Sequence, residues 1–116
     1  MTVRRIVANI AAAKAEDARH FYGDLFGLDM LMDQGWITTF GSDRQMSVQL
    51  SVMTEGGSGT PVPGLSIEVD DVDAIHADLV RAGFAAEYGP VDEPWGVRRF
   101  FVRDPMGTLV NVLMHL

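Results

Sequence analysis

The stretch of residues 65–83 reads LSIEVDDVDAIHADLVRAG and predicts a strand that leads directly into a helix. Leu65–Val69 has the short, mainly apolar pattern of a buried strand. Asp70-Asp71 suits the start of a helix, because an aspartate side chain accepts hydrogen bonds from the free backbone N–H groups there. Gly83 suits the end of this helix, which we expect to run to about Ala82.

The residues after this helix predict three further strands. Ala85–Tyr88 is a short strand, and Gly89–Gly96 is a loop that contains two prolines. Val97–Arg103 and Thr108–Met114 are strands, and the DPMG sequence of residues 104–107 forms the turn between them. The second half of the chain therefore has the order βαβββ.

The first half of the chain repeats this order. Val3–Ala11 predicts a strand, and a helix follows from Glu16 to a stop at Gly27. Three strands come next, and the last of them alternates regularly between apolar and polar side chains. These strands are Leu28–Met32, Trp36–Phe40 and Gln45–Met53.

A weak repeat supports two similar modules in a single domain of residues 1–116. The modules span about 3–54 and 62–116, with a Gly-rich linker at about 55–61. Each module is too small to bury its sheet alone. We therefore predict an α+β fold in which two βαβββ modules form one curved mixed sheet, with helices outside and a cleft within. The repeated residues are Asp17, Ala18, His20 and Gly27, which recur 56 positions later as Asp73, Ala74, His76 and Gly83.

The composition limits the class of protein. The 116 residues are 47% hydrophobic and carry 9 basic and 16 acidic side chains, which gives a net charge of −7. This acidic balance disfavours binding to nucleic acid or to anionic membranes, and no apolar run approaches the ~20 residues that cross a bilayer. The chain has no cysteine, which excludes disulfides and cysteine nucleophiles and agrees with a cytoplasmic protein.

Three blocks of sequence resemble the motifs of a known family. Residues 18–28 read ARHFYGDLFGL, residues 68–74 read EVDDVDA and residues 104–107 read DPMG. Together they resemble the vicinal oxygen chelate superfamily of glyoxalases, bleomycin-resistance proteins and extradiol dioxygenases. The PWGVRRF sequence of residues 94–100 resembles a motif prominent in bleomycin-resistance proteins. The resemblance implies paired modules around a U-shaped cavity, and a homodimer.

The resemblance also implies where a metal ion would bind. Enzymes of this superfamily hold a divalent metal through His, Glu or Gln side chains of the module strands. The matching positions carry Val7, Gln49, Gly64 (or Leu65) and Asn111. Two of these four positions have no donor, and the other two carry neutral amides. We therefore expect no metal, no other cofactor and no catalytic residue.

The histidines and serines offer no clear replacement for a metal centre. We interpret His20 and His76 as structural residues, because helices of this fold pack outside the cavity. His115 lies beside the C-terminus, where fraying is common. Ser47 and Ser51 lack the His–Asp relay that activates a nucleophile.

The cavity is expected to be apolar and aromatic with a few neutral amides. Its face is defined here by the former metal-ligand positions that the resemblance implies. Aromatic rings stack on flat organic molecules, and amides fix their orientation. Both tryptophans could instead fill the core or a dimer interface. The candidate ligand-binding residues are Trp36, Phe40, Gln49, Trp95 and Asn111.

Three functions fit this pattern. The first is a metal-free binding protein that sequesters an aromatic or cationic compound, such as an antibiotic, which an acidic surface would help to attract. The second is a divergent metal-dependent lyase, isomerase or dioxygenase of the same superfamily. The third is a regulatory or scaffolding domain that uses the fold only to dimerise.

Overall fold

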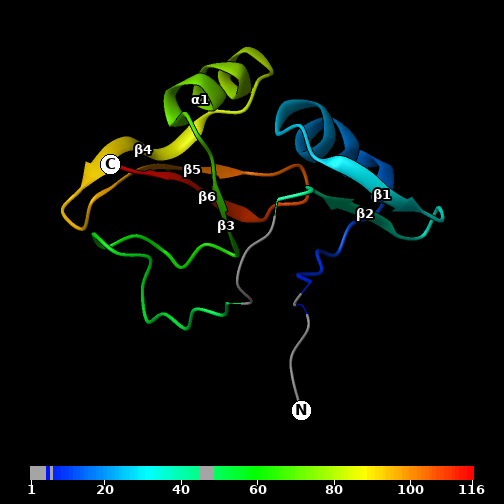
Figure 1. Cartoon of the computed structure of the whole chain (residues 1–116), viewed down its shortest axis with the longest axis horizontal. Helices are drawn as coiled ribbons and strands as arrows, with labels where there is room; N and C mark the ends of the chain where they lie inside the picture. The colour runs from blue at the N-terminus through cyan, green and yellow to red at the C-terminus, as the bar shows by residue number, and fades with distance from the viewer. Residues whose placement is uncertain (1–4, 6, 45–48) are drawn as a thin grey trace.

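The second half of the chain forms a complete βαβββ unit in the computed structural model, which describes residues 5, 7–44 and 49–116. Its four strands are hydrogen-bonded in the order β3-β6-β5-β4. β3 runs parallel to β6, and the other neighbours are antiparallel, so the sheet is mixed. The helix α1 covers one face of this sheet (Figure 1). The elements are β3 (Leu65–Glu68), α1 (Val72–Arg81), β4 (Ala86–Glu93), β5 (Val97–Arg103) and β6 (Leu109–His115).

The first half of the chain forms a helical segment and a hairpin. Figure 1 shows both beside the four-stranded sheet. The predicted helix is confirmed, but it is built from a 3-10 turn and a π-helical turn, in which Phe26 N–H donates to Phe21 C=O. The elements are η1 (Ala15–Asp17), η2 (Arg19–Leu25), β1 (Asp29–Asp33) and the antiparallel β2 (Thr38–Gly41).

The fold class agrees with the sequence prediction, while the outer strands of the first half and the length of β4 differ, since β4 continues to Glu93 through part of the predicted loop Gly89–Gly96. The α+β class and the mixed sheet are confirmed. The described strands form two separate sheets, of four and two strands, where one continuous sheet was predicted. Residues 7–11 and 49–53 were predicted as parts of strands and form none; residues 3, 4, 6 and 45–48 of those strands lie outside the described residues. A strand needs a hydrogen-bonded neighbour, and the alternating pattern of residues 45–53 does not supply one by itself.

The start and end of α1 follow from single residues. The Asp71 side chain accepts a hydrogen bond from Ala74 N–H at 3.1 Å, which confirms the predicted cap. Gly83 has a φ of 94°, a conformation that glycine adopts without steric cost, and it follows the last turn. Between these ends, Val72, Ile75 and Leu79 bury one face of the helix.

The hydrophobic core lies between α1, η2 and the covered face of the sheet. It draws residues from both halves of the chain, so the two halves share one core. Phe21 of η2 is fully buried, and its ring packs edge-on against that of Phe84 at 5.1 Å. The buried core cluster consists of Phe21, Tyr22, Val72, Ile75, Leu79, Phe100, Val102, Val110 and Val112.

One buried hydrogen bond connects the first helix to the last turn. The Tyr22 hydroxyl donates to Asp104 Oδ2 at 2.7 Å. Asp104 Oδ1 accepts from the backbone N–H groups of Met106 and Thr108, at 2.9 and 2.7 Å. Burial, together with the hydrogen bond to the Asp104 carboxylate, raises the pKa of Tyr22 far above its usual range. The DPMG turn thus anchors η2 as well as joining two strands.

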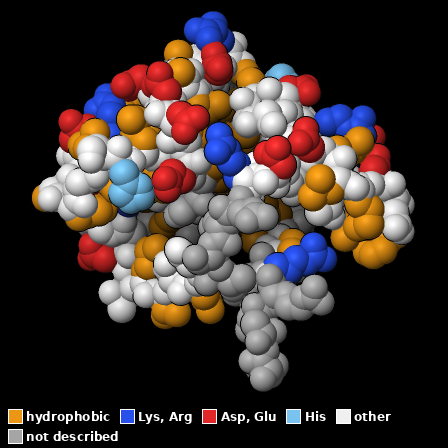
Figure 2. Space-filling model, in the orientation of Figure 1, with side chains coloured by type: hydrophobic (Ala, Val, Ile, Leu, Met, Phe, Trp, Pro, Cys, Tyr) orange, Lys and Arg blue, Asp and Glu red, His pale blue; other side chains and the backbone are white. Residues whose placement is uncertain are grey.

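The outer surface combines acidic and apolar regions. Figure 2 shows acidic side chains over the upper face of the molecule and hydrophobic ones over the outer end of the β1–β2 hairpin. The exposed apolar residues of this hairpin include Met30, Leu31 and Trp36. None of the helices in the described part of the chain has the length and apolarity required to cross a membrane.

We expect Tyr22→Phe to lower the free energy of unfolding by about 2 kcal/mol at pH 7, because Asp104 loses a buried donor while the ring still packs. Because the folded-state pKa of Tyr22 is raised, its contribution is complete below about pH 10, the unfolded tyrosine value, and is lost as pH rises further. Urea unfolding at pH 7 and pH 11 measures both effects.

Asp104→Asn is the matched variant for this measurement, because its amide oxygen can still accept from the two backbone N–H groups. In a double-mutant cycle, the losses of the two single variants should not add, since both disturb the same contact. Fully additive losses would show that the Tyr22–Asp104 hydrogen bond contributes nothing.

Candidate ligand-binding site

One cavity in the described part of the chain has a volume of about 910 Å³. It lies between the N-terminal segment of residues 7–19, the β1–β2 hairpin and β3. Its apolar wall includes Trp36, Phe40, Ile67 and Met106. This volume lies within the range of pockets that hold drug-sized molecules.

Charged and polar groups border this cavity. Arg19 and Asp33 form an exposed ion pair with 3.2 Å between Nη2 and Oδ2. Lys14 and Glu16 also line the cavity, as does the buried Tyr22. The apolar wall is therefore bordered by side chains of both signs, which can orient a ligand that has a polar or charged group.

The structure brings two of the five predicted ligand-binding residues together. Trp36 and Phe40 both line the cavity, and the Phe40 ring lies 6.2 Å from that of Tyr22. The Trp36 side chain is free to contact a ligand, since the residue is 79% exposed. Gln49 is exposed in a segment without regular structure. Trp95 lies in the turn between β4 and β5, and Asn111 lies in β6. Neither is among the residues that line this cavity, and their assignment stays a prediction.

The three histidines lie apart from one another, with His20 and His115 exposed and His76 half-buried. His20 Nδ1 is 3.2 Å from Asp24 in the next turn of η2, and His76 of α1 packs beside the ring of Phe100. His115 Nδ1 lies 3.5 Å from Glu68 Oε2 at the exposed end of β6. Each histidine is thus paired with a different neighbour.

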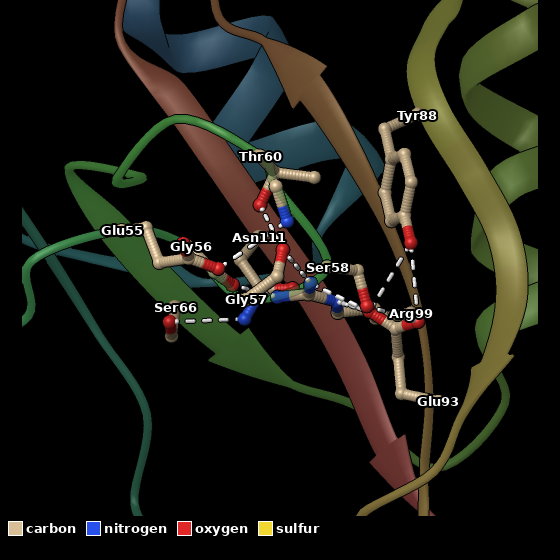
Figure 3. A network of polar contacts seen from close by, with 11 residues as sticks. Glu55, Gly56, Gly57, Ser58, Thr60, Ser66, Tyr88, Glu93, Arg99 and Asn111 are labelled. Atoms are coloured by element: carbon tan, nitrogen blue, oxygen red, sulfur yellow. Dashed lines mark hydrogen bonds and ion pairs between the residues drawn. The ribbon is translucent and has the colours of Figure 1, made fainter.

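The sheet face opposite α1 carries a second group of polar residues. Along β5, Phe100 and Val102 belong to the core beneath α1, so the alternating residues Arg99 and Phe101 point to the other face. Asn111 of β6 is paired directly with Phe101. Residues 55–60, which we call the strap, lie against this face (Figure 3).

Arg99 holds the strap through two backbone carbonyl groups. Its guanidinium donates to Gly56 C=O at 2.7 Å and to Gly57 C=O at 3.2 Å. It also forms an ion pair of 2.6 Å with Glu93, and both side chains are at least 95% buried. The carboxylate of Glu93 accepts further hydrogen bonds from Ser58 and Tyr88.

Aromatic rings surround the same guanidinium. Arg99 Cζ lies 4.9 Å from the centre of the Trp95 ring and 4.8 Å from that of Phe101, and Tyr88 is at 5.5 Å. These distances are typical of cation–π contacts. Sequence reasoning missed this cluster, because Arg99 looks like an ordinary charged residue in a strand. Its signal was an arginine on a strand whose same-face neighbours, Val97 and Phe101, are apolar.

Asn111 is the least satisfied polar residue on this face. Its Nδ2 donates to Ser66 Oγ of β3 at 3.1 Å. Its Oδ1 is buried and has no hydrogen-bond partner among the described residues, and the whole residue is only 8% exposed. Buried polar atoms of this kind call for an explanation, such as a bound water or ligand.

The residues at the family's metal positions do not fit a divalent metal ion. Val7 and Gly64 offer no side-chain donor, and Gln49 and Asn111 offer only neutral amides. The amide nitrogen of Asn111 is already directed to Ser66. Among the residues described, no three His, Asp or Glu side chains are grouped closely enough to hold a metal ion.

We expect Arg99→Met to lower the free energy of unfolding by about 3–5 kcal/mol, because it leaves the Glu93 carboxylate buried without its cation. The neighbouring Arg98→Met is the matched control. Arg98 pairs with Asp73 and Asp92 at the surface, so its loss should be much smaller. Urea unfolding of both variants measures the difference, and equal losses would contradict a buried pair.

Comparisons with known proteins agree with this architecture. The family model described as the Glyoxalase/Bleomycin resistance protein/Dioxygenase superfamily matches residues 4–112. No curated protein gives a significant match to the chain.

Solved structures with a similar fold include TnmS3, an antibiotic binding protein from Streptomyces sp. CB03234. It is 28% identical, and the match covers 87% of this chain and 86% of that chain with a TM-score of 0.63. A glyoxalase/bleomycin resistance protein from the same strain is 31% identical, covering 84% of this chain and 88% of that chain with a TM-score of 0.57. A superfamily member from Sphaerobacter thermophilus DSM 20745 is 22% identical, covers 98% of both chains with a TM-score of 0.69, and supports the fold alone.

Proposed function

Because this chain belongs to the glyoxalase/bleomycin resistance protein/dioxygenase superfamily, we propose that it binds an aromatic or cationic small molecule, such as an antibiotic, without chemistry. The observation that carries this proposal is the cavity of about 910 Å³ beside the exposed ring of Trp36. A related protein at 28% identity is described as antibiotic binding, which supports the same class of ligand.

The chemistry of the cavity favours a flat ligand with a polar or cationic group. Trp36 and Phe40 offer aromatic faces on which a planar ring system can stack. Glu16 at the border can attract a cation, and the net charge of −7 adds a long-range attraction. Binding by these groups requires no metal, and the donors at the family's metal positions support a metal-free protein.

We expect a planar cation to quench the fluorescence of Trp36, because stacking brings the ligand against the indole ring. The chain has two tryptophans, so Trp95→Phe leaves Trp36 as the only reporter and Trp36→Phe leaves Trp95. Titration with metal-free bleomycin and with ethidium should quench emission in the Trp95→Phe protein. Trp36→Ala should raise the dissociation constant of the ligand about tenfold, and equilibrium dialysis measures this change.

Two results would contradict this function. If neither bleomycin nor ethidium binds to the wild-type protein at concentrations up to millimolar, an aromatic or cationic ligand loses its support. A stoichiometric, tightly held metal ion, found by elemental analysis of protein purified without chelators or a histidine tag, would favour the metal-dependent enzyme instead.

We also propose that the chain works as a homodimer in the cytoplasm. The support for a dimer is a set of large apolar side chains that one copy leaves in water, including Leu50 and Val52, which are 78% and 93% exposed. A second copy could cover these residues and supply a neighbouring strand for the segment of residues 49–53. The absence of cysteine agrees with the cytoplasm.

We expect Val52→Glu to shift the protein toward monomer, because a carboxylate at an apolar contact must lose its hydration. Val80→Glu is the matched control, since Val80 is also exposed, on the outer side of α1. Sedimentation velocity over a concentration series measures the dimer dissociation constant, which should rise at least about tenfold for Val52→Glu only. A wild-type monomer at all concentrations would refute the dimer.

A further inference from the structure

We propose that the Asp33 carboxylate binds the cationic group of the ligand, and that the Arg19 side chain occupies this position until a ligand displaces it. The ligand is then a planar aromatic molecule whose ring carries an amidinium or guanidinium group. This inference rests on the proposed function, because it concerns the same cavity beside Trp36, which Asp33 and Arg19 both line. It narrows the ligand to one kind of cation and names the contact that selects it.

Asp33 is held in place by the turn of the β1–β2 hairpin. Its Oδ1 accepts hydrogen bonds from Gly35 N–H at 3.1 Å and from the Thr38 hydroxyl at 3.4 Å. Gln34 N–H donates to Ile37 C=O at 3.0 Å and closes the same turn. The two groups that donate to Oδ1 are neutral, so they orient the carboxylate without cancelling its charge. A group that is already oriented binds a ligand at a lower cost in ordering.

Arg19 is the movable member of the ion pair. It comes from η2 and not from the hairpin, and its side chain is 53% exposed. Its Nη2 lies 3.2 Å from Asp33 Oδ2 and 3.6 Å from Met30 Sδ, which is a weak acceptor. Exposed ion pairs contribute little to stability, because both charges are hydrated when they separate. A ligand cation can therefore displace Arg19 into water at small cost.

The fixed carboxylate also decides the sign of the ligand charge. A ligand anion that bound to Arg19 would lie close to Asp33, and the two negative charges would repel each other. A ligand cation that binds Asp33 meets no fixed charge of its own sign there, because the flexible Arg19 side chain can turn away. The other charged residues that line the cavity, Lys14 and Glu16, have opposite signs, so Asp33 determines the preference.

The contact seen in the structure favours a planar cation. Asp33 holds a guanidinium, whose flat shape, delocalised charge and N–H donors are shared by an amidinium. Trp36 lies in the same hairpin turn as Asp33. An aromatic ring bonded to an amidinium can therefore stack on the indole while its N–H groups donate to the carboxylate.

Naphthamidine, naphthamide and naphthoate separate the effects of shape and charge, because they share one aromatic ring system. The first is a planar cation, the second is a neutral molecule of nearly the same shape, and the third is an anion. Equilibrium dialysis with the full chain measures the dissociation constant of each compound. We expect the wild-type protein to bind naphthamidine most tightly and naphthoate least tightly.

Arg19→Met removes the side chain that competes with the ligand. We expect this variant to lower the dissociation constant of naphthamidine about tenfold and to leave that of naphthamide unchanged, because only the cation uses Asp33. Arg98→Met is the matched control, since it removes the same charge from a surface pair with Asp73 and Asp92. It should change neither dissociation constant.

Asp33→Asn removes the charge and keeps the turn, because the amide oxygen can still accept from Gly35 N–H and the Thr38 hydroxyl. We expect the dissociation constant of naphthamidine to rise about tenfold and that of naphthamide to stay the same. Unchanged binding of naphthamidine to this variant would overturn the inference.

Two further results would overturn it. Equal changes for naphthamidine and naphthamide in Arg19→Met, or weaker binding of naphthamidine, would show that Arg19 supports the site and does not block it. Tighter binding of naphthoate than of naphthamide to the wild-type protein, lost in Arg19→Met, would make Arg19 itself the partner of the ligand. In these cases naphthamide still binds, so the proposed function stands. If none of these compounds binds, and neither bleomycin nor ethidium does, the proposed function fails and this inference fails with it.

Discussion

The hydrogen bond from Tyr22 to Asp104 is the contact on which the arrangement of the two halves depends. It joins residues 82 positions apart and is buried at both ends. Two backbone N–H groups hold Oδ1 of the Asp104 carboxylate, so the Tyr22 hydroxyl donates to the other oxygen of a carboxylate that is already oriented. This places η2 against the sheet and brings the hairpin that follows η2 into position beside β3. The cavity of about 910 Å³ is lined by the N-terminal segment, this hairpin and β3.

The second half of the chain follows its sequence more closely than the first. Asp71 and Gly83 define the two ends of α1 through local chemistry, which needs no knowledge of distant residues. The alternating pattern of residues 45–53 is as regular as any in the chain, yet its described part, residues 49–53, forms no strand. Strand formation depends on a partner, and local pattern carries no information about whether a partner is present. The residue patterns therefore predicted the order of the elements but not this outcome.

The candidate site shows the same division between local and distant information. Trp36 and Phe40 lie in one hairpin, so their common position on the cavity wall follows from a short stretch of sequence. The Arg99 cluster joins the strap, β4 and β5, and it appears only when the backbone carbonyls of Gly56 and Gly57 are located. Every residue has the same backbone carbonyl group, so the sequence does not indicate which carbonyl groups Arg99 contacts. Asn111 is a similar case. The sequence shows that it carries an amide, but it does not show that the amide oxygen lacks a hydrogen-bond partner among the described residues.

The position of β6 in the sheet has a consequence for the order in which the sheet can form. β6 follows β3, β4 and β5 in the sequence, but it lies inside the sheet, between β3 and β5. Its parallel pairing with β3 joins Leu65 to Val110 and closes a long loop. Before β6 is in place, β3 has no hydrogen-bonded neighbour in this sheet, while β4 and β5 can already pair as a hairpin. The slow, non-local step of folding is therefore the insertion of β6, and a chain that has not completed it exposes apolar surface and unpaired strand edges.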